Sequence, residues 1–96
     1  MQAYTFNQRV ENLYKSYFST YENISIILDE DQIKIYLIDD QNLDPASLEL
    51  KKFKQYDQIT FWDGYSQSEV IETTSERESA KTLKRFMKKI LKILNR

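Results

Sequence analysis

The sequence predicts an α+β fold, a small antiparallel sheet of four to five strands flanked by an N-terminal and a C-terminal helix. Apolar residues recur at helical spacing near both ends of the chain, and between those segments they alternate with polar residues. Turn-forming residues divide the alternating region into short segments. A chain of 96 residues has the size of one domain, so residues 1–96 form a single domain with the element order α-β-β-(β)-β-β-α.

Two segments, residues 6–18 and 75–94, carry the period of an amphipathic helix. Each begins with the spacing of a capping box, Thr5 with Gln8 in the first and Ser75 with Glu78 in the second. Acids at the start of the second segment and lysines near its end complement the helix dipole. The apolar stripes consist of Phe6, Val10, Leu13, Tyr14, Tyr17 and Phe18 in the first segment and of Leu83, Phe86, Met87, Ile90, Leu91 and Leu94 in the second.

Residues 23–39 have the pattern of a β-hairpin. Apolar residues alternate on both sides of four polar residues, Asp29 to Gln32, which suit a tight turn. Ile27, Tyr36 and Ile38 make the second face of this hairpin apolar as well. That face is therefore either covered by another element or exposed and adhesive.

The middle of the chain is less regular. In the loop of residues 39–47, Asp44 followed by Pro45 predicts a short helical turn, because proline suits the first helical position. Residues 48–54 stay ambiguous between a strand and a turn, since their apolar residues fit neither period.

A second hairpin is predicted around Asp63 and Gly64. Residues 56–62 alternate as a strand, and a further strand follows within residues 65–73. The Asp-Gly pair predicts a type I′ turn, in which both central residues have positive φ. The two helices and the first hairpin supply the residues of the predicted core, which are Val10, Leu13, Ile26, Ile35, Phe86, Ile90 and Leu91.

Residue types that the chain lacks exclude several function classes. Without His or Cys there is no imidazole base, no Ser-His or Cys-His pair and no thiolate zinc site. A single glycine excludes the glycine-rich phosphate loops. Residues 40–44 begin like a calcium loop, but Pro45 and Lys51 stand where that loop needs Gly and Glu. We therefore expect no enzymatic activity, no cofactor and no metal site.

The cellular setting is predicted from composition. No apolar run reaches the length of a transmembrane helix, and the N-terminus lacks a signal-peptide pattern, so we expect a soluble cytoplasmic protein. Lys outnumbers Arg, and Ile and Tyr are abundant, as in proteins encoded by AT-rich DNA. This composition is typical of a low-GC bacterium, or of a phage or plasmid that lives in one.

Charge is segregated along the chain although its net value is only −1. Residues 22–49 contain eight acids and one base, whereas residues 80–96 contain seven bases and no acid. Three interpretations stay open. The charges are solvated faces, or they pair with each other within the molecule, or one of them is a docking surface.

The sequence favours a small non-catalytic protein that binds another protein, of the inhibitor, immunity, antitoxin or phage counter-defence type. Acidic loops would meet a basic partner and speed association, and aromatics beside the second hairpin turn would hold the complex together. An opposing interpretation assigns Phe61 and Trp62 to the core, with the tyrosines as cross-strand partners. The predicted partner-binding residues are Asp29, Glu30, Asp31, Asp39, Asp40, Asp44, Trp62 and Tyr65.

The alternative function is a nucleic-acid-binding module. Basic residues at helical spacing would place a row of positive charges along one side of the helix at residues 80–96, suited to phosphates. A sequence pI near 5.4 counts against this alternative, although a local patch acts regardless of the overall charge. The residues predicted for it are Lys81, Arg85, Lys88 and Lys92.

Overall fold

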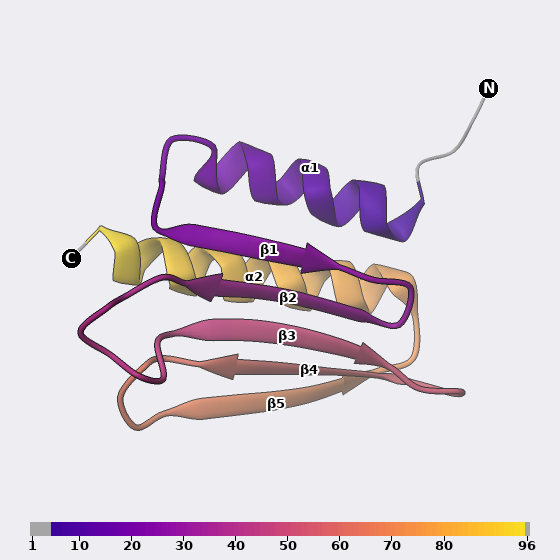
Figure 1. Ribbon diagram of the computed structural model, residues 1–96. Coiled ribbons are helices and arrows are strands. Elements are labelled where there is room, and N and C mark those ends of the chain that lie inside the picture. The colour runs from indigo at the N-terminus through magenta and orange to yellow at the C-terminus, as the bar shows by residue number, and fades with distance from the viewer. Residues whose placement is uncertain (1–4, 96) are drawn as a thin grey trace.

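Five antiparallel strands form one sheet in which every strand pairs with its neighbour in the sequence, in the order β1-β2-β3-β4-β5. The computed structural model, which describes residues 5–95, places two helices together against this sheet (Figure 1). The predicted fold class is confirmed. The helices are α1 (Phe6–Phe18) and α2 (Glu76–Leu94), and the strands are β1 (Ile24–Leu28), β2 (Gln32–Leu37), β3 (Ser47–Lys52), β4 (Asp57–Trp62) and β5 (Ser68–Thr73).

Both helices begin at the predicted caps. The Thr5 hydroxyl accepts from the Gln8 backbone N–H, and the Gln8 side chain accepts in return from the Thr5 N–H, so this capping box is complete. At α2 the Ser75 hydroxyl accepts from the Glu78 N–H, but the Glu78 carboxylate accepts from Thr74 rather than from Ser75. The second capping box is therefore only half formed.

The core lies between the helices and one face of the sheet. Val10, Ile35, Phe86 and Ile90 are fully buried in it, as predicted. Three further residues of the predicted core are only partly buried and pack at its margin, namely Leu13, Ile26 and Leu91. For Ile26 and Leu13 the reason is their position, since Ile26 lies on the edge strand β1 and Leu13 lines a hollow between α1 and α2.

The ambiguous segment at residues 48–54 forms most of β3. Leu48 and Leu50 are fully buried and face the helices, while Glu49 points to the opposite face. Phe53 broke the alternation because it lies beyond the end of β3, in the turn to β4. There it is exposed and stacks on Tyr56, with ring centroids 5.0 Å apart.

Two predicted turns are wrong. No helical turn follows Asp44, because its backbone groups serve the loop instead: its N–H donates to the Asn42 side chain and its carbonyl accepts from Trp62. The Asp63-Gly64 turn is not type I′, since Gly64, with φ +90°, is the one residue with positive φ in the described range 5–95. The Asp63 carboxylate accepts from the backbone N–H groups of Tyr65, Ser66 and Gln67 and holds a wider loop, residues 63–67.

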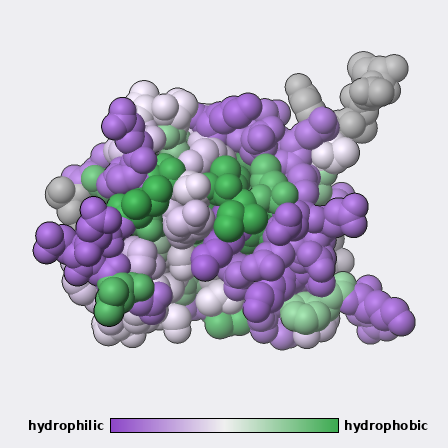
Figure 2. All heavy atoms as spheres, in the orientation of Figure 1, coloured by the Kyte–Doolittle hydropathy of each residue, from purple (hydrophilic) through white to green (hydrophobic). Residues whose placement is uncertain are grey.

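The second face of the sheet is bare, because α2 packs on the other face and α1 packs against α2 and the edge strand β1. Ile27 and Val70, on the two edge strands, are exposed there, and Tyr36 is half-buried. In the view of Figure 2 the apolar side chains form separate patches between polar ones rather than one continuous area. The second face of the first hairpin is thus exposed and not covered by another element of residues 5–95, which decides between the two predicted possibilities. No helix within residues 5–95 has the length and apolar character needed to cross a membrane.

Candidate interaction surface

The structure separates the predicted partner-binding residues into two groups at opposite ends of the sheet (Figure 1). Asp29, Glu30 and Asp31 form the turn between β1 and β2. The remaining acids, Asp39, Asp40 and Asp44, lie in the loop between β2 and β3, which joins the other ends of the strands. The length of β2 keeps the two groups about 20 Å apart, at roughly 3.3 Å per residue. A single small contact area would reach only one of them.

The β2–β3 loop (residues 38–46) is fixed by its own polar side chains. The Asp39 carboxylate accepts from the Gln41 N–H at 2.9 Å, and the Asn42 side-chain oxygen accepts from the Asp44 N–H at 3.0 Å. The Asn42 amide nitrogen donates to the Gly64 carbonyl at 3.1 Å, which ties this loop to the β4–β5 loop (residues 63–67). The two loops therefore form one preorganised unit.

Trp62 supports this unit from the sheet. Its indole Nε1 donates to the Asp44 carbonyl at 2.9 Å, and the ring lies half-buried on the bare face. Phe61, its neighbour, points into the core and packs on Phe86, with ring centroids 5.5 Å apart. The interpretation of Phe61 as a core residue is confirmed, while Trp62 braces a loop instead of joining the core.

Three large apolar side chains are exposed at this end of the sheet. Leu43 is wholly exposed (105%), Tyr65 is 75% exposed and Ile38 is 51% exposed. Ile38, Asp39 and Tyr65 also line a hollow of about 380 Å³ that the last turn of α2 closes. We call this area the loop-end surface; it consists of Ile38, Asp39, Asp40, Leu43, Asp44 and Tyr65.

Sequence reasoning missed two residues of this end. Leu43 stands alone in a polar loop, where no period marks it as either buried or exposed. Asn42 acts on Gly64 across 22 positions of the sequence, and such a long-range bond has no local pattern. Its local bond to Asp44 is the usual Asx-turn chemistry and is the one available signal.

Basic residues line the solvent side of α2, as predicted, but Arg85 is engaged elsewhere. Its guanidinium donates twice to the Glu69 carboxylate of β5, at 3.2 and 2.8 Å, and the Lys89 ammonium donates to the same carboxylate at 2.8 Å. Hydrogen bonds from Arg85 and from Lys89 lower the pKa of Glu69 to about 2. Charge pairing within the molecule thus occurs, but within residues 5–95 it joins α2 to β5 and not to the acidic loops.

Lys81, Lys88 and Lys92 are exposed on the same helix. Among residues 5–95, no carboxylate lies within ion-pair distance of any of the three. The predicted row of positive charges is therefore present along α2 without Arg85.

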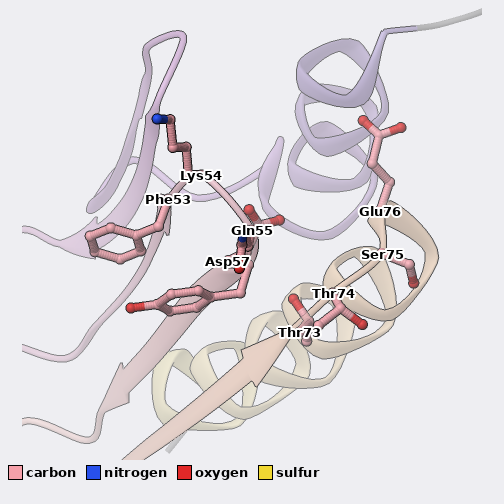
Figure 3. A pocket seen from close by; sticks show the side chains of 9 residues that line it. Phe53, Lys54, Gln55, Asp57, Thr73, Thr74, Ser75 and Glu76 are labelled. Carbon is pink, nitrogen blue, oxygen red and sulfur yellow. The ribbon is translucent and has the colours of Figure 1, made fainter.

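A second hollow, of about 230 Å³, lies at the opposite end of the sheet beside the start of α2 (Figure 3). Phe53, Tyr56 and Asp57 line one side of it. The Asp57 carboxylate accepts from the buried Ser79 hydroxyl at 2.8 Å, and Ser79 in turn lies 2.5 Å from the Thr73 hydroxyl. These polar groups form hydrogen bonds with one another. We therefore interpret them as a structural contact that holds α2 against the sheet.

Side chains of metal-ligating type do not converge in the part of the chain that the structure describes: no three of them are grouped closely enough to hold an ion. The acids of the β1–β2 turn and of the loop-end surface are exposed to solvent. What the arrangement offers is a rigid, partly apolar surface with acids around it.

Comparisons with known proteins identify no similar protein. No family model matches the chain, and no match is found among curated proteins or among solved structures. Function is therefore argued from the surfaces themselves.

Proposed function

We propose that this is a non-catalytic binding protein whose loop-end surface docks on a basic surface of another protein. The observation that carries the proposal is Leu43, a wholly exposed apolar side chain at the tip of a loop held by hydrogen bonds. Single exposed leucines are ordinary on protein surfaces. Here, however, Ile38 and Tyr65 are exposed at the same end, and acids stand on both sides of Leu43.

This combination has the physical properties of a docking surface. Burying exposed apolar area is the main source of binding free energy, and a loop that is already ordered loses little entropy on binding. The acids at Asp39, Asp40 and Asp44 speed the encounter with a positively charged partner. The apolar centre then mainly sets the dissociation rate, and the charged rim mainly sets the association rate.

The same surface supports the class of protein that we propose. A small chain without catalytic groups that presents a fixed surface acts by occupying its partner, as inhibitors, antitoxins, immunity proteins and phage counter-defence proteins do. A basic partner surface is typical of proteins that handle nucleic acids. We place the protein in the cytoplasm of a bacterium, with origin in an AT-rich genome or in a phage or plasmid carried there.

Partner capture from a bacterial lysate tests the apolar centre. The double variant Leu43→Ser/Tyr65→Ser removes exposed apolar area from the loop-end surface. A matched control, Ile27→Ser/Val70→Ser, removes it from the bare face of the sheet. We expect the first variant to lose the captured partner and the control to keep it. Equal retention by both variants, with unchanged melting curves, would refute the proposal.

Association rates with the captured partner test the charged rim. Neutralising Asp39, Asp40 and Asp44 to Asn should slow association several-fold at low salt and flatten its salt dependence. The β1–β2 turn offers a control with the same loss of charge, Asp29→Asn/Glu30→Gln/Asp31→Asn. If the variant of the β1–β2 turn slows association and the variant of the β2–β3 loop does not, the binding surface lies at the other end of the sheet and this assignment is overturned.

A further inference from the structure

A second surface lies between the two helices, on their solvent side. Arg9 of α1 and three bases of α2 surround a hollow of about 290 Å³. We call this hollow the interhelix groove; it is lined by Arg9, Leu13, Arg77, Ala80, Lys81 and Lys84. Arg9 was not marked by the sequence, because it adjoins the others only through the packing of α1 on α2.

The charges of the groove are free to meet a ligand. Arg9, Lys81 and Lys84 are exposed, and within the described residues none of them has a carboxylate at ion-pair distance. Two acids beside or within α2 have partners outside the groove. Glu69 holds Arg85 and Lys89, and the Glu78 carboxylate accepts from the Thr74 N–H.

The direction of the helices adds to this positive potential. α1 and α2 begin at the same end of the molecule and flank the groove with their first halves (Figure 1). A helix carries a partial positive charge at its N-terminus, so two such ends side by side reinforce the field of the four bases. The first turn of α1 contains no acid, while Glu76 and Glu78 moderate the first turn of α2.

Further bases extend the groove along α2. Arg77, Lys81, Lys84, Lys88 and Lys92 follow one another at intervals of three or four residues, which places them on one side of the helix. From Arg77 to Lys92 this row is about 22 Å long, at 1.5 Å per residue. A nucleic-acid duplex carries one negative charge per roughly 1.7 Å of its axis, so each basic side chain in the row has a phosphate within reach.

We propose that the interhelix groove binds the sugar–phosphate backbone of a nucleic-acid duplex. The described part of the lining favours a sugar–phosphate backbone over unstacked nucleobases, because among residues 5–95 it offers cations and no aromatic ring on which a nucleobase could stack. Binding is then independent of base sequence and strongly dependent on salt. The groove lies near the helix starts and the loop-end surface near the end of α2, so this inference does not rest on the proposed function.

Fluorescence anisotropy with a labelled DNA duplex of mixed sequence measures this binding between about 50 and 200 mM salt. If the four basic residues of the groove each neutralise one phosphate, a plot of the logarithm of the affinity against the logarithm of the salt concentration has a slope of about −3.6. The triple variant Arg9→Gln/Lys81→Gln/Lys84→Gln should lose more than tenfold in affinity at the lowest salt. Its slope should be reduced by about three.

The control triple Lys34→Gln/Lys51→Gln/Lys54→Gln removes the same charge from the sheet and its turns. It should bind the duplex within about twofold of the unmodified protein, because it leaves the groove intact. Equal losses in the two triples would show attraction by overall charge only and would overturn the proposal. So would the absence of duplex binding at the lowest salt, or tighter binding to phosphatidylserine vesicles than to the duplex. Circular dichroism of each variant confirms that it is folded.

Discussion

Replacing Ser79 by Ala tests whether buried hydroxyl groups fasten α2 to the sheet. Ser79 is fully buried, and its hydroxyl bridges the Asp57 carboxylate and the Thr73 hydroxyl. Asp57 and Thr73 are register partners at the ends of β4 and β5, so one side chain of the helix joins both strands. The substitution removes both bonds and leaves the buried Thr73 hydroxyl without this partner.

The size of the effect follows from the two bonds. A hydrogen bond to a charged group contributes about 1.5–3 kcal/mol and one between neutral groups about 0.5–1.5 kcal/mol. Alanine is the better helix former and returns about 0.5 kcal/mol. We expect the free energy of unfolding to fall by about 2–3 kcal/mol, a large part of the roughly 5–15 kcal/mol that stabilises a domain.

Urea unfolding followed by circular dichroism measures this loss. With a slope of about 1–3 kcal/mol per molar, typical of small domains, the midpoint should fall by about 0.7–3 M. Ser16→Ala in α1 is the control, because its hydroxyl donates to the Leu13 carbonyl at an exposed site. This substitution should change stability by less than about 0.5 kcal/mol. A loss below about 0.5 kcal/mol for Ser79→Ala would show that apolar packing alone holds this end of α2.

Three further measurements use the same unfolding assay. Phe86→Ala should lower the free energy of unfolding by about 3–5 kcal/mol, since the Phe86 ring is fully buried in the core. Leu13→Ala should lower it clearly less, since Leu13 is only partly buried. Equal losses would contradict the packing described. The Glu69 pKa of about 2 lies below its ordinary 4.5, so the stability from its ion pairs is complete above pH 4.5 and is lost as the pH falls towards 2. Glu69→Gln should remove that part of the pH dependence and leave the rest. Gly64→Ala should cost about 1–2 kcal/mol, because φ is +90° and a Cβ would lie 3.1 Å from the Ala46 nitrogen; an unchanged midpoint would mean that the loop relaxes.

The helices and the strands could be predicted because each depends on short-range patterns. The cap at Thr5 and the alternation around Ile35 depend on neighbouring residues, and the structure confirms both. The turn at Asp63 was predicted wrongly because Asp-Gly is compatible with several loops. Here the carboxylate of Asp63 captures three backbone N–H groups and selects the longer loop.

The surfaces could be predicted only in part, because they are assembled from distant segments. The acids at Asp39, Asp40 and Asp44 were identified, but the exposed Leu43 beside them was not. In the same way Lys81 was identified on α2, whereas its companion Arg9 lies more than seventy residues earlier. Which charges remain available also depends on the fold, since Arg85 belongs to Glu69 only after β5 and α2 have met.

The order of the elements along the chain has a consequence for its synthesis. Each strand can pair with the strand made just before it, so the sheet needs no segment that has yet to be translated. Its apolar face, in contrast, stays open to water until α2 is made, because α2 contributes Leu83, Phe86, Met87 and Ile90 to the core. At about 5–20 residues per second, the nineteen residues of α2 take about one to four seconds to translate, and the sheet cannot bury its apolar face before then. Until α2 has packed on the sheet, the exposed apolar surface makes the nascent chain prone to aggregation.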